Sequence, residues 1–352
     1  MKHIFTLLLI ACSINIALAQ KSKPAPVITR CVKLTGTIDK TPVTIIILHK
    51  GEEFFGSYYY DATEEPNELI GKLHAGTLRM VTNDRKTGDI SEEFSGKFND
   101  SSYTGSWTYN GKVLPFNLTK ANTDGLNFDF VTTSGSRSLK IGEGFGRDAI
   151  SYDAAAVCPS ASSTHPATQL IRERVFEAFG YGSANSNTIG QVMLENKKEV
   201  LSQGSEIEKY GVLVDVSIVY WSKQMLTLSV YNWEDNGGAH GNYTIKYINI
   251  DLGASKQGVE MFNDCQELAA VEERKLREYF NVSKDKRMSD FLLVDSMPSA
   301  RNYIITTKGI TYSYDPYEIA AYDAGQIKLY IPYKEVEGCL TDEFKKLIGM
   351  NK

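Results

Sequence analysis

Residues 93–109 read EFSGKFNDSSYTGSWTY and contain one small pattern twice. In each copy, at Phe94–Phe98 and at Tyr103–Trp107, two aromatic residues lie on either side of a central glycine, with one residue between. Side chains alternate between the two faces of a strand, so both aromatic rings of a copy lie on one face. The glycine lets the backbone bend or approach a neighbouring strand closely. The stretch therefore predicts strands of an antiparallel sheet.

Short runs of this kind fill the sequence from about residue 28 to residue 132. They are rich in β-branched and aromatic residues and include a third copy of the pattern at Phe54–Tyr58, with Phe55 inserted. Their regular spacing predicts an antiparallel all-β domain over residues 28–132, folded as a meander, a sandwich or a small barrel. The aromatic residues could line a ligand pocket, but packing in the core is favoured because aromatic rings commonly fill such cores.

The first nineteen residues are typical of a secretory signal peptide. A lysine precedes a mostly apolar run from Ile4 to Ala19, and the small residues at its end fit a cleavage site. Residues 1–19 are therefore predicted to be removed on export to the periplasm or the extracellular space. One alternative stays open, because Leu9–Cys12 resembles a bacterial lipobox, in which Cys12 would carry a lipid anchor.

Composition and charge exclude several classes of function. The chain has 352 residues, of which 42% are hydrophobic and 23% charged, as is usual for globular proteins. The formal net charge is −5, and no basic run interleaved with aromatic residues is present, so a nucleic-acid partner is not expected. No membrane span is predicted in the mature chain. The glycines at 142–146 do not fit the nucleotide-binding fingerprint, and no cofactor is predicted.

Four cysteines follow the predicted signal peptide: Cys31, Cys158, Cys265 and Cys339. An even number in an exported chain permits two disulfides with three possible connectivities, although buried free cysteines are the alternative. No pair has the C-x-x-C spacing of a zinc knuckle, and the histidines lie far apart in the sequence, so no metal site is predicted.

The second half of the chain mixes helical and strand patterns. Residues 133–150 are rich in glycine and serine and predict a linker, followed by an α+β domain over residues 151–349 with helices packed on an antiparallel sheet. The strongest helical pattern starts at Asp264, which with Glu267 resembles a capping box. Cys265 lies on the apolar stripe of this helix, where a disulfide would be protected.

Two loops of this second domain are candidates for function. The first joins two predicted strands and contains Asn236, Gly237, Gly238, His240 and Gly241. Glycine and asparagine tolerate positive φ, so the loop can fold back tightly on itself. His240 is interpreted as an anchor that bonds to the loop backbone, because the sequence names no nucleophile or acid–base partner for it. No G-x-S-x-G motif is present either, and no catalytic residue is predicted.

The second loop, Tyr314–Gly325, contains three tyrosines and a proline between two predicted strands. Tyrosine offers a large rigid surface and a hydroxyl group, which suits contact with a protein or glycan partner. The alternative is that these tyrosines only pack the loop onto the sheet.

Together, NGGAHGNYTIKYINIDLG (236–253) and YIITTKGITYSYDPYEIAAYDAGQIKLYIPYKEV (303–336) resemble the bacterial DUF3298 domain. The region before them, from Tyr152 to Gly241, resembles the DUF4163 or PdaC-type domain. This pair occurs in RsiV-like anti-sigma factors that bind lysozyme and beside the catalytic domain of PdaC-type peptidoglycan deacetylases. The resemblance implies an α+β fold outside the cytoplasm and a signature role for Gly237, Gly238 and His240. It also implies that the loop containing Pro316, Tyr317, Glu318 and Tyr322 contacts a ligand.

The sequence thus predicts an exported, non-enzymatic envelope protein that binds a protein or peptidoglycan ligand. It lacks the catalytic aspartate and paired histidines of a deacetylase, as well as the cytoplasmic segment of an anti-sigma factor. The alternative is an enzyme acting on envelope glycans, with its site around the loop Gly237–Gly241.

Overall fold

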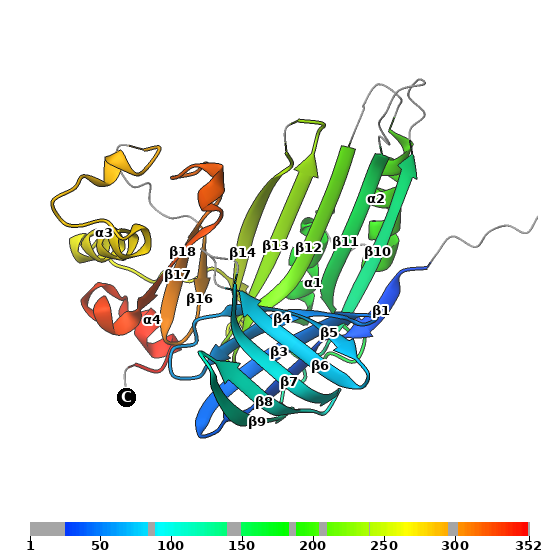
Figure 1. Cartoon of the computed structure of the whole chain (residues 1–352), viewed down its shortest axis with the longest axis horizontal. Helices are drawn as coiled ribbons and strands as arrows, with labels where there is room; N and C mark the ends of the chain where they lie inside the picture. Colours follow the sequence, from blue (N-terminus) through cyan, green and yellow to red (C-terminus); the bar gives the residue numbers. More distant parts are fainter. Residues whose placement is uncertain are drawn as a thin grey trace, which may run out of the picture.

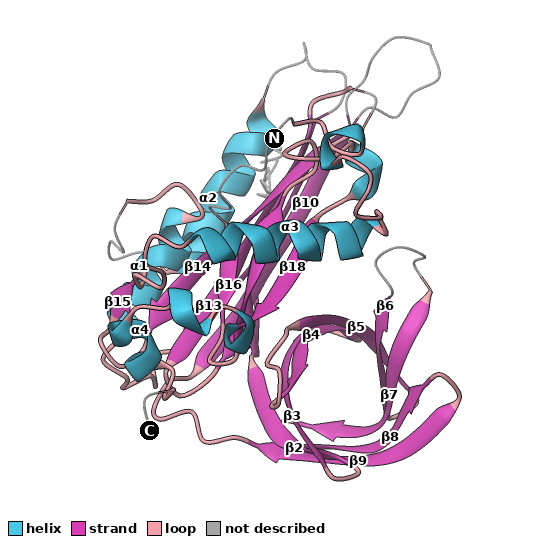
Figure 2. Ribbon diagram, turned by 90° about the vertical axis from the view of Figure 1, so that its left-hand side faces the viewer, coloured by secondary structure: helices cyan, strands magenta, loops and turns pink. Residues whose placement is uncertain are grey.

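The computed structural model describes residues 25–83, 89–138, 149–182, 188–203, 210–238, 240–294 and 302–350. These residues form a closed barrel, a seven-stranded sheet with two helices, and a three-stranded sheet with helix α3 (Gln266–Phe280) (Figures 1 and 2). The predicted fold class, an antiparallel β domain followed by an α+β domain, is confirmed. The predicted signal peptide and Cys12 lie outside the described residues.

Eight strands form the barrel, each antiparallel to the next, and the last pairs with the first. Closure of this kind removes free strand edges. The strands are β2 (Val32–Ile38), β3 (Thr41–Lys50), β4 (Glu53–Tyr60), β5 (Asn67–His74), β6 (Thr77–Asn83), β7 (Ile90–Asn99), β8 (Ser102–Tyr109) and β9 (Lys112–Lys120). Figure 2 looks into the barrel from one end.

The repeated glycines lie where barrel strands approach each other most closely. Gly96 of β7 pairs directly with Gly105 of β8. A Cβ atom at Gly96 would lie only 2.0 Å from the carbonyl oxygen of Thr104, so any other residue would push the strands apart. The sequence pattern thus marks a close approach of backbones, as predicted.

The aromatic residues of the pattern fill the barrel interior. Phe94 is fully buried and packs edge-on against Tyr58, with ring centroids 5.2 Å apart, and against Phe116 at 5.4 Å. Tyr103 is also fully buried, and its hydroxyl donates to the carbonyl oxygen of Phe94 at 2.9 Å. Core packing rather than a pocket is therefore the use of these rings.

The large sheet has the strand order β1-β10-β11-β12-β13-β14-β15, in which β11 and β12 are parallel and the other neighbours antiparallel. Its strands are β1 (Val27–Arg30), β10 (Phe128–Ser138), β11 (Ala149–Pro159), β12 (Tyr210–Trp221), β13 (Met225–Asp235), β14 (Asn242–Asp251) and β15 (Lys256–Gln257).

The predicted bounds of the β domain, 28–132, and of the linker, 133–150, differ from those in the structure. The barrel itself occupies residues 32–120, whereas 27–30 and 128–132 pair within the large sheet. Residues 133–138, expected in the linker 133–150, extend β10 and pair with β11. Most of them are exposed, so this end of the strand is polar and lacks the apolar alternation of a buried strand. Residues 139–148 of the predicted linker lie outside the described residues.

Helices α1 (Thr168–Glu177) and α2 (Ile189–Ser202) cover one face of the large sheet, where they pack on β10 and β11. Their buried residues, including Ile171, Val175 and Val192, join the core of the sheet. Thr188 and Gln191 form a capping box that starts α2. In Figure 1 both helices lie behind the sheet, and no helix of the described residues covers the opposite face.

The third unit contains β16 (Tyr303–Ile305), β17 (Gly309–Tyr314) and β18 (Ile327–Pro332), with α3 packed against β18. A short helix, α4 (Asp342–Leu347), closes the chain. The 3-10 turns are η1 (Met288–Asp290), η2 (Tyr322–Ala324), η3 (Tyr333–Glu335) and η4 (Glu337–Cys339). Among the described residues, no helix is long and apolar enough to cross a membrane.

One disulfide joins Cys265 to Cys339, with their Cα atoms 5.5 Å apart. Cys31 and Cys158 are free, so the expected second disulfide does not form. The capping box predicted at Asp264 is also wrong. The helix begins at Gln266, and Cys265, which has an extended backbone, occupies the N-cap position without a side-chain hydrogen bond.

The barrel is attached to both sheets through β4 and the loop that follows it. Tyr59 donates its hydroxyl proton to the carbonyl oxygen of Trp221 at 2.8 Å. The Glu64 carboxylate accepts hydrogen bonds from the Tyr220 hydroxyl at 2.6 Å and from the Thr307 amide at 2.7 Å. Barrel, large sheet and small sheet therefore meet at one carboxylate.

Candidate functional site

The two loops singled out from the sequence meet in space. One joins β13 to β14 and the other joins β17 to β18. The His240 ring stacks on the Tyr322 ring, with centroids 4.1 Å apart and an interplanar angle of 28°. The Tyr322 hydroxyl also donates to the carbonyl oxygen of Gly241 at 3.1 Å. Residues more than eighty positions apart in the sequence therefore form one surface.

Three further tyrosines extend this contact into a row of rings. Tyr317 tilts against Tyr322 at 5.5 Å, and Tyr243 meets Tyr322 edge-on at 6.4 Å. Tyr243 in turn stacks on Tyr231 at 5.5 Å. We call these five residues, His240, Tyr322, Tyr317, Tyr243 and Tyr231, the aromatic cluster. All of them are exposed or half-buried, so the rings are accessible.

His240 makes the predicted contact with the loop backbone, but its ring lies in a different place from the one expected. Its Nδ1 lies 2.9 Å from the carbonyl oxygen of Gly241, which is the backbone contact that was predicted. However, the side chain is exposed and lies on Tyr322 instead of filling the inside of the loop. In the described part of the chain, the hydrogen bond to Gly241 is the polar contact found for this ring, and no carboxylate is bonded to it.

The structure explains why two positions of the loop are occupied by glycine. Gly237 adopts a positive φ of 78°, and its amide donates to the Asp235 carboxylate at 3.1 Å. A Cβ atom at Gly241 would lie 2.5 Å from the Trp233 ring, so only glycine fits beneath that ring. Nothing in the structure explains Gly238, and Asn236 is simply exposed.

The predicted contact loop begins with a tight turn. The Glu318 amide donates to the carbonyl oxygen of Asp315 at 3.0 Å, and the Glu318 carboxylate accepts from the Asp315 amide at 2.9 Å. Pro316 occupies the second position of this turn and is buried, which corrects its prediction as a contact residue. Tyr317, Glu318 and Tyr322 retain accessible side chains.

Tyr317 has an unusual backbone. It lies at the third turn position with φ of 69°, where turns of this kind favour glycine or asparagine. A bulky residue in this conformation is rare and strained. Its side chain is nevertheless 53% exposed, so burial of the ring does not offset the strain.

Two tyrosines of the aromatic cluster have raised pKa values. Burial raises the pKa of Tyr231 and of Tyr243, and neighbouring tyrosines raise both further. Their hydroxyls therefore stay protonated and can donate hydrogen bonds. Burial also raises the pKa of Asp315, partly offset by the hydrogen bond from the Ile245 amide. The arrangement can stack on a ligand and bond to it.

The sequence did not single out Tyr231 as a member of the site. A signal was present, because Tyr231 and Trp233 alternate immediately before the glycine loop and Tyr243 follows it. On the paired strands β13 and β14, Tyr231 is the diagonal neighbour of Tyr243 on the same face. A hairpin interpretation of the loop could therefore have placed Tyr231 beside Tyr243.

One group of neighbouring side chains in the described residues has the chemistry of metal ligands. Ligand atoms of Cys265, Glu267 and Cys339 lie within 4.8 Å of one another. Both sulfur atoms are bonded to each other in the disulfide, so this group cannot provide the thiolates that a metal would require.

With this geometry in view, comparison with known proteins identifies part of the chain. Residues 260–334 match the family model described as a protein of unknown function, DUF3298. The chain contains a DUF3298 domain. The domain includes α3, the small sheet and the Tyr317 turn, whereas the glycine loop at 236–241 and the barrel precede the matched residues. The resemblance of residues 152–241 to a DUF4163 domain stays a prediction.

Two solved structures of DUF3298 family members are similar. One from Bacteroides fragilis NCTC 9343 has a TM-score of 0.53 and 18% identity, covering 64% of this chain and 98% of that one. Another from Pseudomonas aeruginosa PAO1 has a TM-score of 0.45 and 15% identity, covering 61% and 95%. A search of curated proteins finds no relative. At 18% identity, the first likeness shows a similar fold and carries no statement about function.

Proposed function

We propose that this protein is an exported, non-enzymatic envelope protein that uses the aromatic cluster to bind a protein or a cell-wall glycan. The observation that carries the proposal is Tyr317, a strained and exposed aromatic residue within the DUF3298 domain. Backbone strain of this kind costs about 1–3 kcal/mol and tends to persist where function needs the side chain.

The neighbours of Tyr317 support the same conclusion. Tyr322 packs against both Tyr317 and His240, so the exposed rings hold one another in place. A ring that is already ordered loses little conformational entropy on binding. Tyrosine is also enriched among residues that contribute most to protein interfaces. The cluster therefore combines rigid apolar surface with neutral hydroxyl donors.

Both candidate ligands can use such a surface. Flat rings pack on the apolar faces of a partner protein, and hydroxyls bond to its backbone. The same groups can lie against sugar rings and bond to their hydroxyls. The sequence resemblance to RsiV-like proteins makes lysozyme a suitable protein probe, and peptidoglycan fragments are the glycan probe. The export signal at residues 1–19, or a lipid anchor at Cys12, would place the protein beside both.

The test is a calorimetric titration of the mature chain with lysozyme and, separately, with soluble peptidoglycan fragments. We expect saturable binding to one of them, weakened roughly tenfold or more by Tyr317→Ala. Tyr109→Ala is the matched control, because that ring is 43% exposed on the barrel, away from the cluster. Absence of binding to both probes, or equal losses in the two variants, would overturn the proposal.

The enzymatic alternative is tested with the same fragments. His240→Ala should weaken binding, because the ring supports Tyr322, and neither wild type nor variant should release new products. Release of fragments by the wild type, abolished in a normally folded His240→Ala variant, would instead establish a glycan-acting enzyme.

A further inference from the structure

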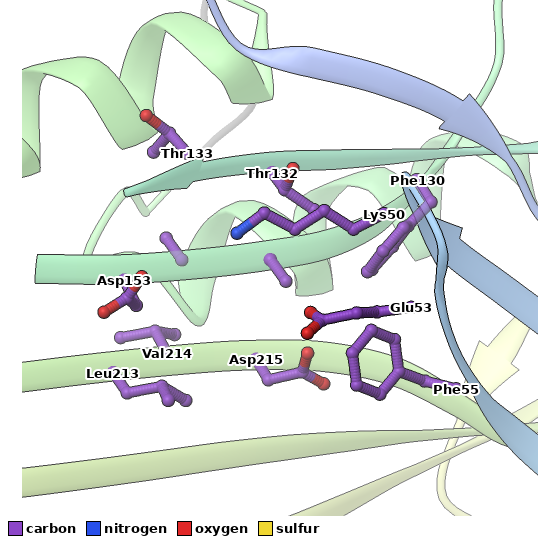
Figure 3. A pocket seen from close by; sticks show the side chains of 12 residues that line it. Lys50, Glu53, Phe55, Phe130, Thr132, Thr133, Asp153, Leu213, Val214 and Asp215 are labelled. Atoms are coloured by element: carbon purple, nitrogen blue, oxygen red, sulfur yellow. The ribbon is translucent and has the colours of Figure 1, made fainter. Parts of the chain in front are cut away.

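A groove runs between the barrel wall and the helix-free face of the large sheet. Two hollows of about 230 and 240 Å³ lie in it, and a third of about 440 Å³ adjoins them on the barrel wall. Phe55 of β4 lines all three. We call this feature the junction groove and define it by Glu53, Phe55 and Ile70 of the barrel and Phe130 and Asp215 of the large sheet. Figure 3 shows the hollow around Asp215.

The walls of the junction groove are largely apolar. Phe55 is 38% exposed and Ile70 is 49% exposed, although both lie on a barrel whose other large apolar residues mostly face its interior. Phe130 of β10 and Val214 of β12 complete the walls of the hollows around Asp215. Exposed apolar side chains gathered along a concave surface often mark an interaction site.

The floor of the first hollow carries an excess of negative charge. Glu53, Asp153 and Asp215 line it together with one cation, Lys50. In Figure 3 the carboxylates of Glu53 and Asp215 point into the same space. No ion pair is recorded for Asp215 among the described residues.

Burial dominates the electrostatic environment of Asp215. Burial raises the pKa of Asp215 to about 6, and a hydrogen bond with Ser217 is the only opposing effect. An effective cation nearby would lower this value. The second hollow adds Tyr231 from β13 and Glu68 from β5, whose carboxylate is paired with Lys328 at 2.6 Å. The hollow on the barrel wall adds Lys72 and Arg79, and Arg79 is paired with Glu93 at 2.7 Å.

We propose that the junction groove binds an extended segment of a basic partner protein, with a lysine or arginine side chain in the hollow at Asp215 and Glu53. The aliphatic stem of such a side chain fits against Phe55 and Phe130, while its charged end meets two carboxylates. An adjacent apolar side chain of the same segment lies against Phe55 and Ile70.

Charge complementarity favours this occupant over the alternatives. An anionic ligand would bring further negative charge beside Asp215. A neutral sugar would leave the charge of the floor uncompensated in a partly desolvated hollow, which costs free energy. The site uses barrel residues that lie outside the DUF3298 domain, so it goes beyond the function proposed for the aromatic cluster.

The test uses two blocked tripeptides, leucine–lysine–leucine and leucine–norleucine–leucine, titrated into the full mature chain. Norleucine keeps the aliphatic stem and removes the ammonium group. We expect the lysine peptide to bind about tenfold more tightly, a preference that weakens with added salt. Binding should also weaken at pH 5 relative to pH 7.5, because Asp215 takes up a proton in that interval.

Variants separate this site from the rest of the molecule. Asp215→Asn should abolish the preference for lysine, and Glu53→Gln should reduce it and serves as the second variant if Asp215→Asn fails to fold. Asp100→Asn is the charge-matched control, because Asp100 is exposed in the turn between β7 and β8. Tyr317→Ala should leave peptide binding unchanged, so failure here is distinct from failure of the aromatic cluster. Equal affinity for both peptides, or an unaltered preference in Asp215→Asn and Glu53→Gln, would overturn the proposal.

Discussion

The barrel interior and the aromatic cluster are built from the same residue types and use them in opposite ways. In the barrel, Phe94 and Tyr103 are completely buried, and Gly96 allows two strands to pack closely around them. Beside the cluster, Gly241 makes room for the Trp233 ring, yet the neighbouring His240 is left exposed. Aromatic residues beside glycines therefore do not distinguish a core from a binding surface.

The two regions differ in whether an unusual backbone feature is accompanied by burial of the neighbouring side chain. Phe94 and Tyr103 gain burial from the geometry that their glycines permit. Tyr317 has the reverse arrangement, with positive φ and an exposed side chain. Asp215 shares this property, because it is a partly desolvated carboxylate without a cation. Features that lower stability, and that no local packing or ion pair compensates, are expected at functional surfaces.

The largest expected effect removes a ring from the barrel. Phe94→Ala deletes a fully buried ring that contacts Tyr58 and Phe116, leaving a cavity. We expect the free energy of unfolding to fall by about 3–5 kcal/mol. Urea denaturation at pH 7 measures this change, with Tyr109→Ala at the barrel surface as the control. A loss below about 1 kcal/mol would show that the interior is not the packed core described here.

Much of the barrel was predictable because its information is local. The spacing of Phe94, Gly96 and Phe98 marks the strand, the inward face and the close approach within five residues. The same holds for α2, where Thr188 and Gln191 form the cap. Pairing partners are different, because the pairing of 27–30 with 129–132 depends on strands far apart in the chain. No local pattern specifies that contact.

The site was predictable in its parts and not in its assembly. Tyr317 and Tyr322 could be singled out by composition, but the stacking of Tyr322 on His240 joins two loops from different sheets. The sequence around Asp215 did not mark it as unusual. Its carboxylate is partly desolvated by barrel residues that are distant in the sequence and line the same hollow. The positive φ of Tyr317 was also hidden, since turn preferences would have predicted glycine or asparagine there.

An intermediate effect concerns Asp215 and pH. The folded chain holds the proton of Asp215 more tightly than the unfolded chain, with a pKa of about 6 against 3.8. The contribution of this group to stability is therefore complete below pH 3.8 and is lost as pH rises through 6. Asp215→Asn removes the charge, so at pH 8 it should raise the free energy of unfolding by roughly 1–3 kcal/mol.

Thermal unfolding of wild type and Asp215→Asn between pH 3.5 and pH 8 checks this expectation. The two melting temperatures should nearly coincide at pH 3.5, diverge between about pH 4 and pH 6, and keep a constant separation at higher pH. Asp100→Asn should follow the wild type throughout, because that carboxylate is exposed. A constant difference across the whole range would mean that Asp215 acts through packing instead of charge.

The smallest expected effect is also the sharpest test of the comparison, because one substitution should move stability and binding in opposite directions. Asparagine tolerates the positive φ that Tyr317 adopts, so Tyr317→Asn should raise the free energy of unfolding by about 1 kcal/mol. The same change removes an exposed ring from the aromatic cluster and should weaken binding of the protein or glycan ligand. Tyr109→Asn controls for the loss of a surface tyrosine and should gain no stability. If Tyr317→Asn were destabilising instead, the contact of Tyr317 with Tyr322 would outweigh the strain, and the ring would belong with the barrel aromatics as a packing residue.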